Sequence, residues 1–262
     1  MKMETPLPKD SQRRKIVLVI PSHDIEKCEI EGESVLFKNN DVSILEVPVS
    51  DKNAEIVRDL AKKGLLTQYR VLVQEPFSDD AYEDLSDAPV KFTIKKAMLF
   101  STLCAHLGAK KVHVLEVKAK RILKEQDFKA STTTFLSQIT ASSVTQSSGE
   151  VKILAEKEES LRSSIKLEDS FQGAEVDIER AKALVEKYNL GNDFNILSLL
   201  ETMSGKNRLI KRKFTIDIFS EMKGVLSILG RLSFPGFIDL AGSYKNFDDI
   251  NVCYSITFEV EF

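Results

Sequence analysis

Apolar and polar residues alternate most regularly at residues 252–262. Every second residue from Val252 to Phe262 is apolar, and most of the residues between them are polar. Successive side chains of a β-strand point to opposite faces of the sheet, so this pattern predicts a strand with one buried and one wet face. We therefore expect the C-terminal strand to lie in the core sheet.

Shorter apolar runs predict further strands. Residues 15–20 form an apolar run closed by Pro21, which is typical of a strand buried on both faces and central in its sheet. Residues 34–37 and 42–49 flank a Lys-Asn-Asn-Asp turn and predict a hairpin. Alternation predicts other strands over 69–73, over 112–119 with a bulge near 113–115, and over 214–218.

Apolar residues at helical spacing alternate along the chain with these strands. The segment over 92–107 is apolar around much of its helix surface, so this helix should be largely buried. The unevenly spaced strands and helices lack the regular alternation of a doubly wound sheet, which predicts an α+β fold with a mixed, mainly antiparallel sheet and packed helices. The other predicted helices cover 54–61 with a stop at Gly64, 176–188, 193–203 and 222–232.

The domain organisation follows from length and composition. A chain of 262 residues with 42% hydrophobic residues is within reach of a single hydrophobic core. Residues 1–14 are polar and lack the apolar stretch of a signal peptide, so we expect a flexible tail there. Residues 15–262 should form one α+β domain, in which a helical hairpin over 173–205 is an alternative sub-lobe.

The most unusual segment covers residues 131–148, which are dominated by Ser and Thr and contain neither Gly nor Pro. Residues 151–155 alternate between apolar and other residues after Gly149, so the two halves predict an extended hairpin over 131–155. A flexible low-complexity loop is the alternative that this composition leaves open.

Charge and cysteine usage exclude several classes of protein. The formal net charge of -3 argues against nucleic acid as a partner, since such proteins normally present a basic face. Cys28, Cys104 and Cys253 lie far apart without CxxC spacing, so buried free thiols are expected rather than disulfides or a zinc site. With no signal peptide and no apolar run long enough to span a bilayer, we expect a soluble, cytoplasmic protein.

Candidate catalytic residues are few. Ser22, His23 and Asp24 have the residue types of a nucleophilic relay, but three consecutive side chains cannot converge in that geometry, so a turn is expected. No glycine follows the strand over 15–20, which argues against a nucleotide cofactor. The sequence therefore predicts no cofactor, and it leaves the catalytic residues unknown and the protein's status as an enzyme undecided.

Metal-binding patterns are equally sparse. His106 and His113 do not have the i,i+4 spacing that places two imidazoles on one zinc ion. The acidic stretch over 79–87 lacks the alternating ligands and the glycine of an EF-hand loop, and we expect it to be an exposed loop. No metal site is predicted.

One dense basic cluster follows the predicted helix over 193–203. It can contact phosphate or an anionic lipid. The alternative is that its cations complement the end of a helix and protect the edge of a sheet. Its members are Lys206, Arg208, Lys211, Arg212 and Lys213.

Three classes of function are compatible with these patterns. The first is a non-enzymatic recognition or scaffold protein that binds a protein partner through an exposed strand, a helical face or the Ser/Thr-rich segment. The second is a regulated membrane-inserting, pore-forming protein in which residues 131–155 unfold into a barrel, because Ser and Thr suit a wet lumen. The third is an enzyme whose site is not visible as a motif. The first is our expectation, and it leaves the oligomeric state undetermined.

Overall fold

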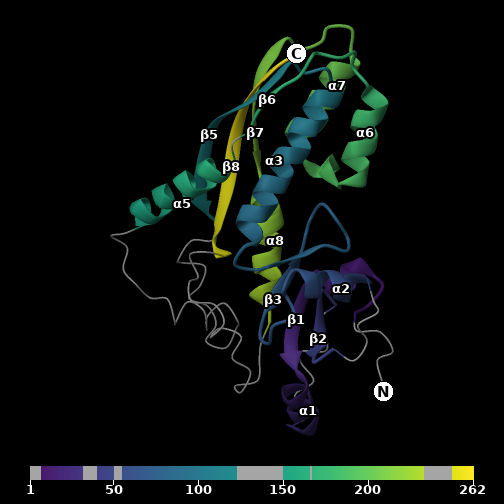
Figure 1. Ribbon diagram of the computed structural model, residues 1–262, viewed down its shortest axis with the longest axis vertical. Helices are drawn as coiled ribbons and strands as arrows, with labels where there is room; N and C mark the ends of the chain where they lie inside the picture. The colour runs from purple at the N-terminus through teal and green to yellow at the C-terminus, as the bar shows by residue number, and fades with distance from the viewer. Residues whose placement is uncertain (1–6, 32–39, 50–54, 123–149, 166, 233–249) are drawn as a thin grey trace.

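The computed structural model describes residues 7–31, 40–49, 55–122, 150–165, 167–232 and 250–262. The described strands divide between two sheets, one mixed and one antiparallel, which lie toward opposite ends of an elongated molecule (Figure 1). One hydrophobic core includes residues of both sheets. The predicted α+β class is confirmed, and the C-terminal strand lies in a core sheet as expected.

The first sheet is built around β1 (Ile16–Pro21). Its strand order is β2-β1-β3-β4, where β2 is Val42–Val47, β3 is Val71–Gln74 and β4 is Tyr82–Asp84. The pair β1 and β2 is parallel, while β3 is antiparallel to both β1 and β4. All six residues of β1 are buried, which confirms the prediction of a central strand. The predicted strand over 34–37 lies outside the described residues, and the partner seen for β2 is β1.

The turn predicted at residues 22–24 is wrong, because helix α1 (Ser22–Glu31) begins directly after β1. Two parallel strands need a crossover connection between them, and α1 lies in the connection from β1 to β2. The helix predicted after β2 is confirmed as α2 (Glu55–Lys62), and Gly64 follows it with a φ of 69°. A positive φ is accessible to glycine without strain, which explains the stop.

The acidic stretch over 79–87 does not form a simple exposed loop, because it contains β4. Asp84 is buried there and ion-pairs with Arg70 at 2.6 Å. The neighbouring Glu83 lies 2.8 Å from the Lys63 ammonium. Cations from other parts of the chain neutralise these carboxylates, so the stretch packs against the sheet although its composition is typical of a solvated loop.

The second sheet has the order β6-β5-β8-β7 and is antiparallel throughout. The C-terminal strand β8 (Val252–Glu261) lies between β5 (Lys111–Arg121) and β7 (Lys211–Asp217), and β6 (Glu168–Ser170) forms one edge. The register of β5 against β8 shifts between residues 114 and 116, which confirms the predicted bulge. The apolar face of β8 is buried, as its alternation predicts.

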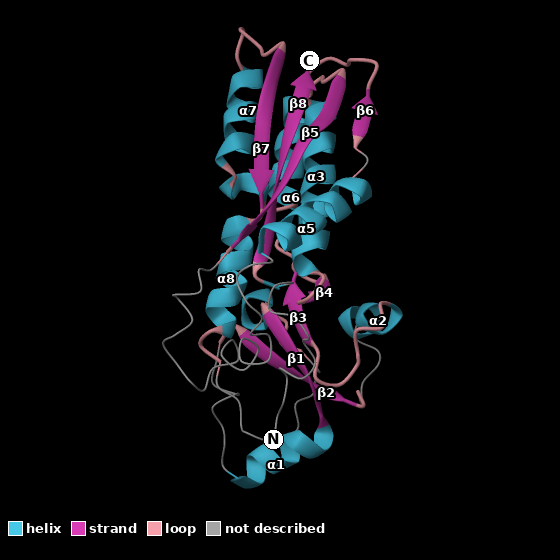
Figure 2. Ribbon diagram, turned by 90° about the vertical axis from the view of Figure 1, so that its left-hand side faces the viewer, coloured by secondary structure: helices cyan, strands magenta, loops and turns pink. Residues whose placement is uncertain are grey.

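Helices α3 (Ala88–His106), α6 (Ile178–Lys187) and α7 (Phe194–Ser204) lie behind one face of this sheet (Figure 2). Phe100 of α3 packs against Phe258 of β8, with the two ring centroids 5.0 Å apart. Helix α8 (Phe219–Leu229) follows β7. The helices predicted over 92–107, 176–188, 193–203 and 222–232 are therefore confirmed within a few residues. Short 3-10 helices cover Ser11–Arg14 and Leu190–Asn192.

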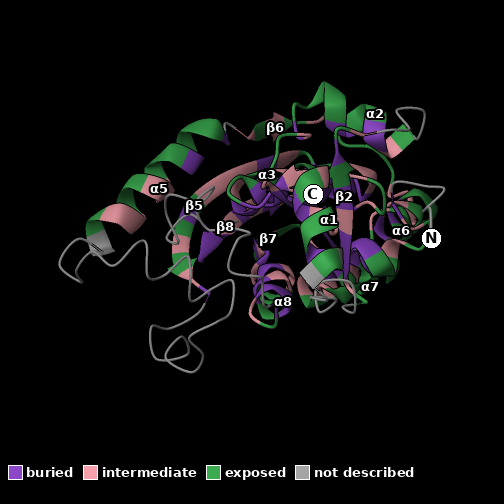
Figure 3. Cartoon of the chain, turned by 90° about the horizontal axis from the view of Figure 1, so that it is seen from below, coloured by how far each residue is buried: buried purple, intermediate pink, exposed green. Residues whose placement is uncertain are grey.

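The strand predicted over 151–155 is wrong, because these residues belong to helix α5 (Glu150–Ser164). An alternation of five residues is too short to distinguish a strand from a helix. Leu161 of α5 is buried, while much of the remaining helix surface is exposed at the side of the molecule (Figure 3). The Glu158 carboxylate accepts a hydrogen bond from the Ala119 backbone N–H at 2.7 Å. Helix α5 therefore covers a part of β5 that the short strand β6, paired with residues 111–113, does not cover. Residues 131–149 of the predicted hairpin lie outside the described residues.

Candidate functional site

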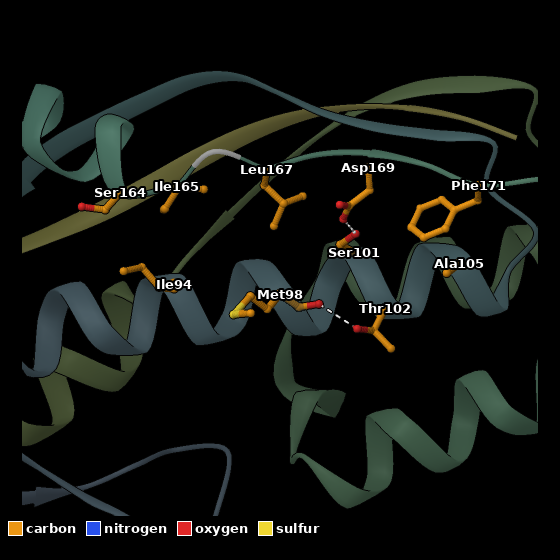
Figure 4. A pocket seen from close by; sticks show the side chains of 10 residues that line it. All are labelled: Ile94, Met98, Ser101, Thr102, Ala105, Ser164, Ile165, Leu167, Asp169 and Phe171. Atoms are coloured by element: carbon orange, nitrogen blue, oxygen red, sulfur yellow. Dashed lines mark hydrogen bonds between the residues drawn. The ribbon is translucent and has the colours of Figure 1, made fainter. Parts of the chain in front are cut away.

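A cavity of about 550 Å³ opens between α3 and the segment that runs from the end of α5 through β6 (Figure 4). This volume is within the range of ligand sites, which are typically about 300–1,000 Å³ and mostly apolar with a few polar groups. Helix α3 forms one wall with Ile94, Met98, Ser101, Thr102 and Ala105, and the opposite wall is Ser164, Ile165, Leu167, Asp169 and Phe171.

The α3 wall is one face of the helix. Its residues follow one another at intervals of one, three or four positions, which places them along a single stripe. Met98 lies near the middle of this stripe and its exposed fraction is 57%. Large apolar side chains on the other faces of α3 are buried, among them Phe92, Phe100 and Leu103. The stripe is therefore a helix face of apolar and hydroxyl side chains that the described part of the chain leaves partly uncovered.

The opposite wall is determined by the alternation along β6. The side chains of Leu167, Asp169 and Phe171 are half-buried and point toward α3, whereas Glu168 and Ser170 are exposed (Figure 4). The Leu167 carbonyl accepts the N–H of Val114 in β5 at 3.3 Å, and the Phe171 N–H donates to the carbonyl of Lys110, directly before β5, at 2.8 Å. Backbone groups of successive residues in a strand point to opposite sides, so those of Glu168 and Ser170 point away from β5. Within the described residues, β6 is the edge of its sheet and this side has no neighbouring strand.

A hydrogen bond joins the two walls at the centre of the cavity. The Ser101 hydroxyl donates to the Asp169 carboxylate, and Ser101 is only 4% exposed (Figure 4). Asp169 makes no ion pair with any cation in the described part of the chain. An ionised carboxylate has about four acceptor positions, so one hydroxyl leaves most of them available. The bond anchors β6 on α3, and among the described residues no cation accompanies the Asp169 carboxylate, which faces a largely apolar cavity.

The composition of the lining favours binding over covalent chemistry. Activation of a serine as a nucleophile requires an adjacent base, usually His, with a third group that orients it. Among the described residues that line the cavity, Asp169 is the one titratable group, and it accepts a hydrogen bond directly from the Ser101 hydroxyl, without an imidazole between them. The arrangement can hold apolar groups and one hydrogen-bond donor or cation.

A second, more polar cavity of about 460 Å³ adjoins the ammonium of Lys96 on another face of α3. The Lys96 side chain is 5% exposed and lies 2.9 Å from Asp193 and 3.1 Å from Glu221. Its Nζ also donates to the Asp217 carbonyl at 2.6 Å. Burial lowers the pKa of Lys96, but the carboxylates of Glu221 and Asp193 raise it by more, so this pKa lies above its ordinary value of 10.5.

This ion triad connects three elements. Asp193 is the N-cap of α7, where its other oxygen accepts the N–H groups of Asn195 and Ile196 at 3.0 and 3.4 Å. Glu221 lies in the first turn of α8. The three N–H groups of Lys96 have three acceptors, so the ammonium is a structural link between α3, α7 and α8 rather than a free nucleophile.

The sequence contains an indirect signal for the ion triad of Lys96, Asp193 and Glu221. Lys96 lies four residues from both Phe92 and Phe100, so a lysine occupies the apolar stripe of a helix predicted to be buried. A lysine at such a position must find partners of opposite charge. The pair of Ser101 and Asp169 has no comparable signal, because its members are 68 residues apart.

The structure does not bring Ser22, His23 and Asp24 into a relay. The Ser22 hydroxyl donates to the Val47 carbonyl at 3.3 Å, on the other strand of the parallel pair. Asp24 accepts the Tyr69 hydroxyl at 2.8 Å, and its other oxygen lies 3.4 Å from His23, which is exposed. These contacts hold the start of α1 against the end of the sheet.

The remaining histidines and the cysteines lie apart. His106 is the last residue of α3, and His113 lies in β5. Cys28, Cys104 and Cys253 are buried free thiols, as expected. Burial raises the pKa of Cys104, and it raises the pKa of Cys253 to about 11, so both thiols stay protonated near neutral pH. No cluster of three or more His, Cys, Asp or Glu residues in the described ranges has a geometry that could hold a metal ion.

The basic cluster is divided between a loop and β7. Lys211 ion-pairs with Glu259 at 3.0 Å and with Glu261 at 2.6 Å, both on β8. The Arg212 guanidinium lies 5.0 Å from the centre of the Phe214 ring. The other members, Lys206, Arg208 and Lys213, are exposed. Contact of this cluster with an anion or a lipid stays a prediction.

Comparisons with known proteins identify no relative: no protein-family model, no curated protein and no solved structure matches the chain. Among the helices that the structure describes, none combines the length and the apolar character needed to cross a membrane.

Proposed function

We propose that this chain is a recognition protein that binds an extended segment of another protein along the edge of β6. The observation that carries this proposal is that β6 presents backbone groups at the edge of its sheet and side chains to the cavity. Its outward backbone groups, on Glu168 and Ser170, lie at a sheet edge, while the side chains of Asp169 and of the flanking residues Leu167 and Phe171 line the cavity beside α3. An added strand gains main-chain hydrogen bonds from such an edge and specificity from pockets for every second side chain.

The dimensions of the site support this mode of binding. The stripe from Ile94 to Ala105 covers twelve residues of helix, and the eleven steps between its ends measure about 16 Å at 1.5 Å per residue. A strand of five residues has a similar length at about 3.3 Å per residue. A bound strand would also cover Met98, the exposed apolar side chain on the α3 stripe. Exposed apolar surface of this kind is typical of sites that bind other proteins.

Replacing Ser170 with proline tests the proposal at the backbone. Proline removes an N–H that points away from β5, so the bonds within the sheet stay intact while an added strand loses one donor. Peptides selected from a random display library on the wild-type protein would be measured by fluorescence anisotropy. We expect Ser170→Pro to weaken their binding by about three- to tenfold, as for one net hydrogen bond, and Ser170→Ala to have no effect.

Hydrogen exchange gives a second measurement that does not depend on the proline variant folding. The amides of Glu168 and Ser170 should exchange more slowly when a selected peptide is bound. A library that yields no binding peptide, or peptides that leave these amides unprotected, would contradict the proposal.

A further inference from the structure

We infer that the segment recognised at β6 carries a lysine or arginine opposite Asp169, with apolar side chains two residues away on each side. This inference rests on the proposed function and specifies the chemistry of its partner. It follows from the order of side chains along the wall of the cavity, where Asp169 lies between Leu167 and Phe171.

The spacing comes from the geometry of paired strands. Side chains on one face of a strand recur every second residue, and directly opposite residues of neighbouring strands have Cβ atoms about 4.5–5.5 Å apart. A strand added to β6 therefore directs three alternate side chains into the cavity, at the levels of Leu167, Asp169 and Phe171. The outer two positions face Leu167 and Phe171, which flank β6. On the α3 wall, Met98 lies at the level of Leu167 and Ala105 at the level of Phe171 (Figure 4).

The central position faces a carboxylate that lacks a counter-ion in the described part of the chain. The Lys111 ammonium lies on the other face of the sheet, where it ion-pairs with Glu168 at 2.9 Å. An apolar side chain at the central position would cover the Asp169 carboxylate without replacing the water that it loses, which is costly. A lysine or arginine supplies a charge-assisted hydrogen bond, and its methylene stem suits the apolar walls.

Ser101 makes the carboxylate a better recognition element. Its hydroxyl is buried and fixes one Asp169 oxygen against α3, so the orientation of the carboxylate is set before a partner arrives. Pre-organisation of this kind lowers the entropy lost on binding. A glutamate in the partner would face this fixed negative charge at close range and would be rejected.

Three synthetic peptides test the inference: TVTKTVT and its versions with methionine or glutamate at the centre. The symmetric flanks present the same side chains whichever way the strand runs. By fluorescence anisotropy, we expect the lysine peptide to bind the wild-type protein about tenfold more tightly than the methionine peptide, and the glutamate peptide to bind most weakly. Asp169→Asn should reduce the preference for lysine over methionine to less than about twofold.

The Glu186→Gln variant is the matched control, because it removes an exposed carboxylate of α6 that does not line the cavity. It should retain the preference for lysine, which separates a direct role of Asp169 from a change in the net charge of the protein. Equal binding of the lysine and methionine peptides that is still weakened by Ser170→Pro would overturn this inference and leave the proposed function standing. Failure of all three peptides, together with an empty library selection, would overturn both.

Discussion

Replacing Lys96 with methionine should destabilise the fold strongly although the two side chains have similar lengths. The change removes the cation and leaves the carboxylates of Asp193 and Glu221, 14% and 24% exposed, facing each other around an apolar side chain. It also removes the donor for the Asp217 carbonyl. A buried polar group that loses its partner bears the full cost of its desolvation.

The magnitude follows from this burial. Removal of one partner of a buried ion pair typically costs about 3–5 kcal/mol. Water reaches both carboxylates in part, and methionine adds a buried apolar side chain, so we expect a loss of about 2–4 kcal/mol in the free energy of unfolding. With a urea m-value of about 2–3 kcal/mol per M, the unfolding midpoint should fall by roughly 1 M.

Urea unfolding followed by far-UV circular dichroism measures this shift. The control is Lys152→Met on α5, where the side chain is 82% exposed and the substitution should change stability by less than about 0.5 kcal/mol. Adding Glu221→Gln to Lys96→Met should restore part of the loss, because it removes one of the unpaired charges. If Lys96→Met unfolds at the wild-type urea concentration, the triad does not hold the three helices together as we argue.

Three further predictions concern other parts of the fold. Burial raises the pKa of Tyr82 from 10.0 to about 12, so the unfolded chain loses the phenol proton first and the free energy of unfolding should fall as the pH rises from 10 to 12. In urea titrations across this range, Tyr82→Phe should remove roughly 2–3 kcal/mol of that decline, and an unchanged dependence of stability on pH would contradict this. Glu158→Ala should speed hydrogen exchange of the Ala119 amide by about three- to tenfold, and unchanged exchange would mean that α5 does not cap β5. Gly108→Ala should lower the free energy of unfolding by about 1–3 kcal/mol in thermal melts, because the φ of Gly108 is 83° and the new Cβ would lie 2.7 Å from a backbone oxygen. Gly224→Ala, where the new Cβ meets open space, should stabilise α8 by about 0.5–1 kcal/mol, and equal effects of the two substitutions would refute the strain assigned to Gly108.

The elements that sequence reasoning predicted correctly are those whose local pattern reports burial. The alternation in β8, the continuous apolar run of β1 and the apolar surface of α3 each record which faces of an element contact the core. The bulge in β5 was visible for the same reason, because the phase of its alternation changes within the strand. Where the pattern was short, as over 151–155, the same reasoning chose the wrong element.

The sequence by itself therefore determined the α+β class, most of the helices and the buried character of the C-terminal strand. Only the tertiary structure decided that the strands form two sheets, that β1 and β2 run parallel, and that α5 covers β5. It also decided both polar clusters, since Ser101 meets Asp169 and Lys96 meets Glu221 across separations of 68 and 125 residues. A periodic pattern encodes which face of an element is buried, but which side chains meet depends on how those faces pack, and that is a property of the whole chain.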